Sequence, residues 1–233
     1  MALIFKGIQK TTLIDFPRQI ACTLFLPNCN FKCGYCYNTA LVENKDTGVS
    51  ISEQQALAFL EERKRFLDGV CLTGGEPTLC RELPAFCAKV KQKGFLVKID
   101  TNGTNPEMLK ELIEKRLVDF IAMDIKAPLE KYPLFANAPV DLKKIKQSIG
   151  IIKKSGLEYE FRTTVVPALS EEDILEIARL LKGAKKFVLQ QFQNSMPLLD
   201  KNLEKQQPHS PEELKKFSEK IKGFFEKTEI RGI

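Results

Sequence analysis

Histidine is almost absent from this chain, and its scarcity excludes several kinds of site. Among 233 residues there is one histidine, His209, in the proline-flanked stretch "QQPHSP". We expect it to be a solvated loop residue. One histidine argues against a zinc site built from histidines. It also argues against a nucleophile activated in a Cys–His or Ser–His pair.

Long apolar runs are missing as well. The first residues, "MALIFKGIQKTTLIDFP", carry an apolar patch that charges soon interrupt, so they indicate neither a signal peptide nor a spanning helix. No later stretch is apolar for long enough to cross a bilayer. With 43% hydrophobic and 28% charged residues, the composition is typical of a soluble globular protein. We expect one domain over residues 1–233, a cytoplasmic location and no membrane partner.

The cysteines do not suggest a disulfide framework, because their number is seven and no export signal is visible. Cys22 and Cys71 stand in apolar runs and are expected to be small core residues. Cys80 and Cys87 flank the start of a predicted helix and are also interpreted as structural. The other three crowd into "CNFKCGYC", residues 29–36.

The net charge is +6, and its lysines are mostly mixed with glutamates on predicted helices. The simpler interpretation is a solvated helical face. The alternative is a weak electrostatic preference for an acidic partner surface or a nucleic acid.

Apolar runs of strand length alternate with segments of helical period. The expected strands are 20–26, 69–73, 95–100, 120–125, 159–166 and 186–192, and the expected helices are 52–66, 82–94, 105–117, 141–156, 170–183 and 210–225. The helix starts are marked by Ser52, Asn105, Ser170 and Ser210, with Pro106 and Pro211 in the first turn, and the stops by Gly94, Gly156 and Gly183.

The strands are interpreted as near-continuous hydrophobic runs, which is typical of a parallel sheet covered by helices. Six strand–helix units suggest an α/β barrel, but eight are needed to close one. We therefore expect a partial, open βα barrel of about six parallel units. Its core would span residues 18–192, and a loop and a helix would follow in 193–233.

Chemistry in α/β barrels is found at the carboxyl ends of the strands, and the unusual residues of this chain follow predicted strand ends. They are "PNCNFKCGYC" (27–36), "TGGEPT" (73–78), "DTNGT" (100–104), "MDIKAP" (123–128), Arg162 with Thr163 and Thr164, and Gln190 with Gln191. One rim should therefore gather thiols, a Gly-Gly-Glu turn, carboxylates, cations and amides.

These motifs resemble the radical S-adenosylmethionine superfamily. The resemblance rests on the CxxxCxxC loop with an aromatic residue before its last cysteine, and on "GGEP" after the second strand. "KTTLIDFP", "LPNCNFKCGYCYN", "DTNG" and "MDIK" make the chain similar to activating enzymes of glycyl-radical enzymes. It is most similar to the short activating proteins of anaerobic ribonucleoside-triphosphate reductases, and the resemblance spans residues 8–192.

The resemblance explains why the motif stops at three cysteines. In that superfamily three thiolates hold three irons of a [4Fe-4S] cluster and leave the fourth iron open for S-adenosylmethionine. The reduced cluster passes one electron to the sulfonium, and the 5′-deoxyadenosyl radical then removes a hydrogen atom. The cofactors carry this chemistry, so no catalytic side chain is assigned. Only Cys71 lies between Cys36 and Gly74, so one cluster is expected.

The resemblance also implies site residues. Cys29, Cys33 and Cys36 would be the cluster ligands, with Phe31 and Tyr35 as apolar surroundings and Tyr35 near the adenine. The expected S-adenosylmethionine contacts are Tyr35, Gly74, Gly75, Glu76, Asp100, Asn102, Asp124, Lys126, Arg162 and Gln191. Related activases place a monovalent cation at the positions of Asp100, Thr101 and Asp124. Related formate-lyase activases carry histidine near the sixth strand end, where this chain has Gln190 and Gln191.

Simpler alternatives stand beside these roles. Lys126 and Arg162 could form plain rim ion pairs with Asp124 or Glu160. The two glutamines could merely end a strand. A structural zinc knuckle could use the three cysteines with a stray fourth ligand.

The implied partners are a glycine loop of a large glycyl-radical enzyme, which the open side of the barrel would admit, and an electron donor such as flavodoxin or ferredoxin. The loop 198–210 and the positive charge would help docking. One rival is a radical enzyme acting on a small molecule, such as 7-carboxy-7-deazaguanine synthase. The other is a non-catalytic metal- or nucleic-acid-binding module; it leaves the polar rim unexplained, so no nucleic acid is expected.

Overall fold

A twisted eight-stranded sheet forms the centre of the computed structural model, which describes residues 3–43, 45 and 48–233. Its order is β10-β9-β8-β7-β6-β5-β3-β2, with all neighbours parallel except β2 and β3. The strands are β2 (Gly7–Thr12), β3 (Ala21–Leu26), β5 (Gly69–Gly74), β6 (Leu96–Thr101), β7 (Phe120–Asp124), β8 (Glu158–Val165), β9 (Lys186–Gln191) and β10 (Lys227–Arg231). Within the described residues β2 and β10 are edges that do not pair with each other.

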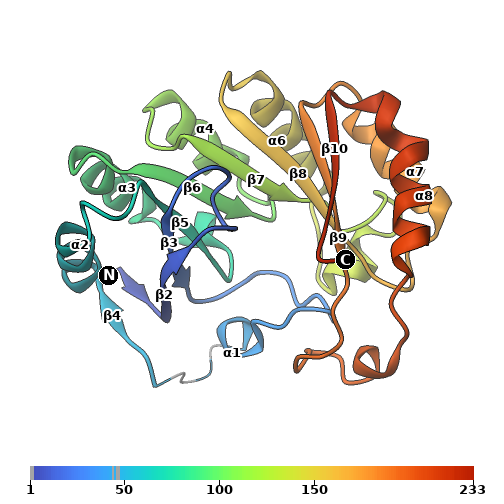
Figure 1. Cartoon of the computed structure of the whole chain (residues 1–233), viewed down its shortest axis with the longest axis horizontal. Coiled ribbons are helices and arrows are strands. Elements are labelled where there is room, and N and C mark those ends of the chain that lie inside the picture. Colours follow the sequence, from blue (N-terminus) through green and yellow to red (C-terminus); the bar gives the residue numbers. More distant parts are fainter. Residues whose placement is uncertain (1–2, 44, 46–47) are drawn as a thin grey trace.

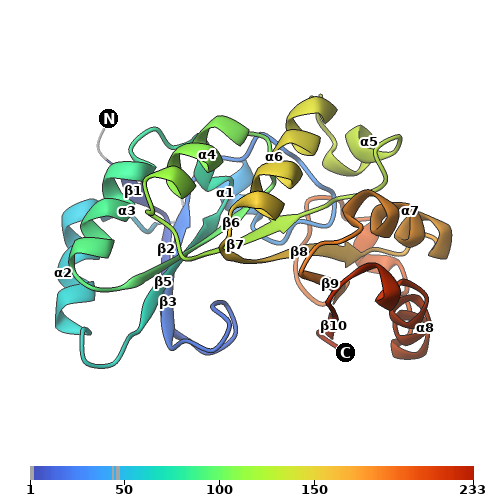
Figure 2. The ribbon, with the colours of Figure 1, turned by 90° about the horizontal axis from the view of Figure 1, so that it is seen from above.

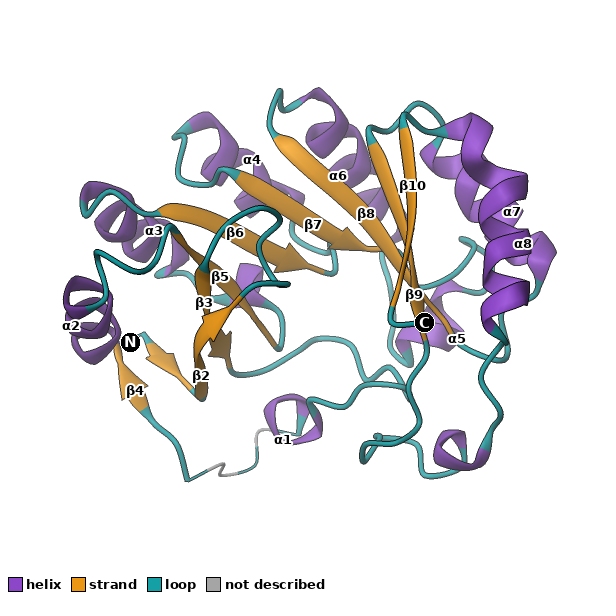
Figure 3. Ribbon diagram, viewed as in Figure 1, coloured by secondary structure: helices purple, strands orange, loops and turns teal. Residues whose placement is uncertain are grey.

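Helices cover the outer side of this sheet (Figures 1 and 3). They are α2 (Glu53–Glu62), α3 (Leu83–Gln92), α4 (Pro106–Glu114), α6 (Leu142–Lys154), α7 (Glu171–Leu181) and α8 (Pro211–Ile221), with the short α1 (Thr39–Val42) and α5 (Tyr132–Ala136) in loops. Single 3₁₀ turns occupy Pro77–Leu79, Leu203–Lys205 and Lys222–Phe224, and β1 (Ile4–Phe5) pairs with β4 (Ile51–Ser52). The expected open α/β barrel is confirmed.

Local signals explain the helix boundaries. Ser52, Ser170 and Ser210 each accept a hydrogen bond from the third helical residue and form a capping box with it, and Asn105 caps α4. Gly94, Gly156 and Gly183 follow their helices with positive φ angles, as expected for helix stops.

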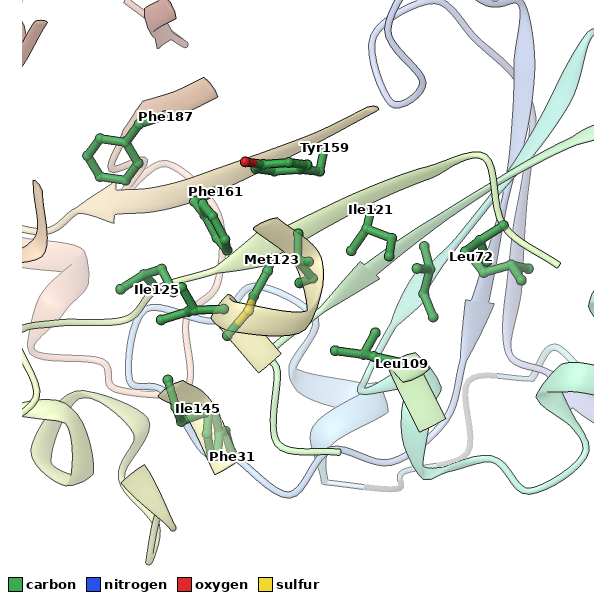
Figure 4. Close-up of a cluster of buried hydrophobic side chains, with 14 of the residues drawn as sticks. Phe31, Leu72, Leu109, Ile121, Met123, Ile125, Ile145, Tyr159, Phe161 and Phe187 are labelled. Carbon is green, nitrogen blue, oxygen red and sulfur yellow. The ribbon is translucent and has the colours of Figure 1, made fainter. Parts of the chain in front are cut away.

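The hydrophobic core lies between the sheet and its helices. Figure 4 shows Leu72, Ile121, Met123 and Phe161 of the strands packed toward Leu109 and other side chains from the helices and loops, all buried. Burial of this face supplies the main driving force that holds the helices on the sheet.

The other face of the sheet differs from the expectation of continuous apolar strands. Along β6 and β8 apolar residues alternate with charged ones, so one face meets the helices and the other is polar. We name the charged side chains of this second side the charged face: Lys98, Asp100, Asp124, Glu160, Arg162, Lys186, Glu229 and Arg231. The prediction failed for these strands because buried charged side chains can line a sheet face when they pair with one another, as Lys98 does with Asp100 and Glu160 with Arg231.

The loop between β2 and β3 lies on the side of the sheet away from α3, α4 and α6 (Figure 2). Its Phe16 is buried against Ala21, Phe120 and Ala122, with the two phenyl centroids 6.1 Å apart. This small apolar cluster is the counterpart, on the charged side, of the main core.

The expectation for His209 is wrong. His209 is not a solvated residue: its side chain is 15% exposed, Nε2 lies 3.0 Å from the Leu169 carbonyl oxygen, and the ring contacts Phe217 edge-on. Proline neighbours signal a loop, but not whether that loop packs.

None of the described helices is both long and apolar enough to span a membrane. Met1 and Ala2, in the segment considered as a leader, lie outside the described residues.

Candidate functional site

The three cysteines lie in the loop between β3 and α1. Cys33 is buried, whereas Cys29 and Cys36 are half-buried. The Cys36 amide donates to the Cys33 carbonyl at 3.0 Å, which tightens the end of the motif. Phe31 is buried with its ring edge-on to Tyr132, at 6.4 Å between centroids, as its expected wrapping role requires.

A later part of the chain fastens this loop from outside. The amide of Leu199 donates to Cys36 O at 3.2 Å, and the amide of Asp200 donates to Gly34 O at 2.9 Å. A cavity of about 430 Å³ lies beside these bonds, bordered by Gly34 and Asp200. The segment after β9 therefore holds the cysteine loop, a contact that local sequence patterns did not signal.

The thiols have raised pKa values because they are withdrawn from water. Burial raises the pKa of Cys29 to about 11 and raises those of Cys33 and Cys36 as well, while the charge of Lys126 lowers all three. Lys126 therefore favours the thiolate form that an iron ligand needs.

Three cysteine thiols on one loop are a donor set that fits an iron–sulfur cluster. No group of three or more His, Cys, Asp or Glu in the described part of the chain is arranged to hold one ion. Thiolates around a zinc ion would need sulfurs about 4 Å apart, given Zn–S bonds of about 2.3 Å. A cluster spreads its ligands over separate corners, so three thiols on one loop suit it.

Gly74 is the last residue of β5, and Gly75 follows it; both lie against the start of the cysteine loop. The amide of Gly75 donates to Leu26 O at 2.9 Å, and that of Glu76 donates to Asn28 O at 2.7 Å. A Cβ on Gly75 would lie 1.8 Å from Asn28 O, and one on Gly74, whose φ is +116°, would lie 2.5 Å from Leu26 O. Glycine is thus required at both positions because a side chain there would collide with the protein's own backbone, independently of any ligand contact. The Gly74 carbonyl already accepts from Asn38 Nδ2 at 3.3 Å.

This close approach gives a stability prediction. We expect Gly75→Ala to lower the free energy of unfolding by about 3 kcal/mol, because the new methyl group overlaps a backbone oxygen that cannot move alone. Gly150→Ala is the matched control, since its Cβ would meet nothing within 4 Å inside α6. The control should gain about 0.5–1 kcal/mol. Equal unfolding midpoints in guanidinium chloride for the two variants would contradict this account.

Glu76 is 2% exposed and receives four hydrogen bonds. The donors are Thr78 N at 3.1 Å, Thr78 Oγ1 at 2.5 Å, Thr101 Oγ1 at 2.7 Å and Asn102 N at 2.6 Å. Burial raises its pKa despite these four donors. Glu76 therefore ties the end of β5 to the end of β6.

Asn102 connects β6 to the cysteine loop. Its Nδ2 donates to Asn30 Oδ1 at 2.8 Å and lies 3.9 Å from the Cys29 sulfur. An amide directed at a cysteine sulfur is the kind of outer contact that would tune a cluster bound there. Asn102 thus lies beside a predicted cluster ligand, and its own contact with S-adenosylmethionine stays a prediction.

Four predicted charged residues meet at the rim. Arg162 donates from Nε to Asp124 Oδ1 at 2.8 Å and from Nη1 to Asp100 Oδ2 at 3.3 Å. Lys126 Nζ lies 3.2 Å from Asp124 Oδ2. Burial alone would raise the pKa values of both aspartates, but the neighbouring cations outweigh it and lower them. The ion pairs that the simpler alternative expected with Asp124 are therefore present.

Lys98 was not identified as a site residue. Its side chain is 1% exposed, pairs with Asp100 and lies 3.6 Å from the Cys71 sulfur. Burial alone would lower its pKa, but Asp100 and Cys71 raise it. The signal was available in "LVKID", where a lysine two residues before an aspartate points to the same side of a strand.

Tyr35 and Gln191 complete the predicted set. The Tyr35 ring lies 6.0 Å from Lys126 Nζ, and burial raises the pKa of its phenol. Gln191 donates from Nε2 to His209 O at 3.1 Å, while its buried Oε1 has no hydrogen-bond partner among the described residues. The structure brings all the predicted residues to the carboxyl-end rim, and their ligand roles stay predictions.

Comparison with solved structures supports the fold alone. Streptococcus suis SuiB bound to its precursor peptide SuiA has a TM-score of 0.67 at 14% identity, covering 88% of this chain and 47% of SuiB. This chain thus spans about half the length of SuiB. QueE from Escherichia coli has a TM-score of 0.53 at 17% identity, with 82% and 84% of the two chains covered.

Sequence comparison is more specific. A Methanocaldococcus jannaschii protein, provisionally named a glycyl-radical enzyme activating enzyme, is 34% identical over 100% of this chain and 98% of its own length. A Thermococcus kodakarensis 7-carboxy-7-deazaguanine synthase is 30% identical over 53% of this chain and 48% of its own length. The family model described as the radical SAM superfamily matches residues 23–181. With three cysteines at the carboxyl end of an open barrel, this chain belongs to the radical S-adenosylmethionine superfamily.

Proposed function

We propose that this protein activates a glycyl-radical enzyme, with the anaerobic ribonucleoside-triphosphate reductase as the first candidate partner. One observation carries the proposal: the likeness to the provisionally named activating enzyme extends over the full length of both chains. A likeness of this extent includes the segment after β9 and the last helix, which a shared cofactor domain alone would not require.

The proposed cofactors are one [4Fe-4S] cluster and S-adenosylmethionine. When bound, they would supply an electron and a 5′-deoxyadenosyl radical that takes a hydrogen atom from a glycine. Cys29, Cys33 and Cys36 would hold the cluster, and Asn102 would donate to the Cys29 sulfur. Burial of Cys33 and Phe31 limits the access of water to this site.

Cations at the rim would receive the carboxylate of S-adenosylmethionine. Arg162 and Lys126 are 12% and 15% exposed, so each retains a small accessible surface beside Asp124. Gln191 Oε1 is the acceptor proposed for the adenine or ribose, and Tyr35 would pack near the adenine. The Gly74 and Gly75 carbonyls, near Glu76, would face the ammonium group.

The geometry gives less support to a monovalent cation near Asp100, Thr101 and Asp124. Both carboxylates are already paired with Arg162. The Thr101 hydroxyl donates to Glu76 and accepts from Gly103 N at 3.0 Å. A cation would therefore have to displace the guanidinium.

The direct test is radical transfer. The protein would be reconstituted anaerobically with iron and sulfide, then reduced with S-adenosylmethionine, flavodoxin or ferredoxin, and the glycyl-radical enzyme of the same cell. We expect a glycyl doublet by electron paramagnetic resonance and one 5′-deoxyadenosine per radical formed. Release of 5′-deoxyadenosine over many turnovers on a metabolite, with no protein radical, would contradict the proposal.

That contrary result would favour a second candidate, a radical enzyme acting on a small molecule. The observation behind it is the 30% identity with the Thermococcus kodakarensis 7-carboxy-7-deazaguanine synthase. The match covers only about half of each chain, so this candidate ranks second.

A further inference from the structure

A second group of ion pairs lies on the charged face, around Glu160. Glu160, on β8, is fully buried. Arg231, on β10, donates from Nη1 to Oε1 and from Nη2 to Oε2 of Glu160, both at 2.7 Å. This two-pronged pairing is the strongest geometry between arginine and a carboxylate. Lys186 is a weaker second partner, with Nζ 3.2 Å from Oε2.

The Glu160 carboxylate lies two residues from Arg162 on the same side of β8. Arg162 is 12% exposed and already serves Asp124 and Asp100, at 2.8 and 3.3 Å. Burial alone would lower the pKa of Arg162, but Asp100, Asp124 and then Glu160 raise it. Arg162 thus pairs directly with two carboxylates, and a third, Glu160, lies nearby on the same side of β8 with Arg231 as its partner.

We propose that Arg231 is a positioning residue: by binding both oxygens of Glu160, it leaves Arg162 to hold Asp124 and Asp100 at the rim. This inference rests on the proposed function, because it takes Arg162 as part of the S-adenosylmethionine site. It gives β10 a role beyond extending the sheet. β9 and β10 run side by side in Figure 1.

Loss of Arg231 would leave a buried carboxylate short of partners, which is costly. Lys186 Nζ also pairs with Glu229 Oε2, at 2.8 Å, so this lysine cannot replace both hydrogen bonds that Arg231 donates to Glu160. Arg162 lies two residues further along β8, on the same side as Glu160. We expect the Arg162 guanidinium to turn toward Glu160 and to release Asp124. Arg162 would then no longer be in place to bind the carboxylate of S-adenosylmethionine.

The test begins with Arg231→Met, which keeps the apolar stem and removes the charge. With the cluster-loaded full chain, equilibrium dialysis against labelled S-adenosylmethionine should give a dissociation constant raised about tenfold. The matched control is Lys227→Met, on the same strand; Lys227 is 66% exposed on its side chain and lies 3.7 Å from Glu229. The control should bind like the unmodified protein. Guanidinium denaturation of each cluster-free variant checks that it folds.

A rescue separates positioning from simple support of the fold. Arg231→Met combined with Glu160→Gln removes the competing carboxylate together with its partner. The double variant should bind S-adenosylmethionine within about threefold of the unmodified protein. Without the Glu160 carboxylate, no unpaired negative charge draws Arg162 away from Asp124 and Asp100. A double variant as weak as Arg231→Met would overturn the proposal and leave Arg231 a structural residue only.

Arg162→Met tests the place of Arg162 in the cofactor site separately from the role of Arg231. If this variant binds S-adenosylmethionine normally, the assignment of Arg162 to the cofactor site fails, and the role of Arg231 fails with it. If Arg162→Met binds weakly while Arg231→Met binds normally, only the inference about Arg231 is overturned. Weak binding in both single variants, with rescue in the double variant, supports it.

Discussion

Cys33→Ser should lose nearly all iron and all glycyl radical formation. Serine fits the buried space of Cys33, but its hydroxyl remains protonated where the thiol can become a thiolate ligand. With two thiolates left on the loop, the cluster would have too few protein ligands to be retained. The measurements are iron per chain, the visible absorption of the cluster after anaerobic reconstitution, and the radical signal.

Cys80→Ser is the matched control for that experiment. Cys80 is half-buried beside the turn Pro77–Leu79, and its sulfur lies 3.5 Å from Glu82 Oε2. Since it lies outside the cysteine loop, its variant should keep the iron content of the unmodified protein. Equal iron loss in both variants, or a Cys33→Ser protein that retains its cluster, would be incompatible with the three-cysteine site.

Glu76→Gln should produce the second large effect. The buried carboxylate accepts from Thr78, Thr101 and the Asn102 amide, so an amide group in its place would direct N–H donors at other donors. Leaving buried donors unpaired costs about 1–3 kcal/mol each, and we expect the free energy of unfolding to fall by about 3 kcal/mol or more. Binding of S-adenosylmethionine should fall as well, because Asn102 would lose its fixed place beside Cys29.

Chemical denaturation of the cluster-free chain measures this stability change. Glu62→Gln is the control, since Glu62 is exposed at the end of α2 and should change stability by less than about 0.5 kcal/mol. A Glu76→Gln protein as stable as this control would show that the four hydrogen bonds do not hold the rim together.

Strand and helix order could be predicted because local signals agree with the fold. Serine and asparagine caps, glycine stops and apolar runs each placed an element close to its observed bounds. The short edge strand β10 was missed because five residues, "KTEIR", carry three charges and no apolar run. Its strand state depends on pairing with β9, which is tertiary information.

The rim could be predicted as a set of residues but not as a set of contacts. Motif positions at strand ends brought Cys29, Glu76 and Asp124 to one place, since parallel strands end on one edge. That Glu76 would bind protein donors depends on side-chain directions between β5 and β6. The pairing of Glu160 with Arg231 joins residues 71 positions apart, and no local pattern encodes such a contact.

The bonds from Leu199 and Asp200 to the cysteine loop have a consequence for how the protein matures. The loop is made early in translation, yet its backbone partners emerge from the ribosome more than 160 residues later. The nascent cysteine loop therefore lacks these two hydrogen bonds until most of the chain has been synthesised. Iron delivery to this protein should consequently be a late, post-translational event, timed by completion of the C-terminal third rather than by synthesis of the cysteines.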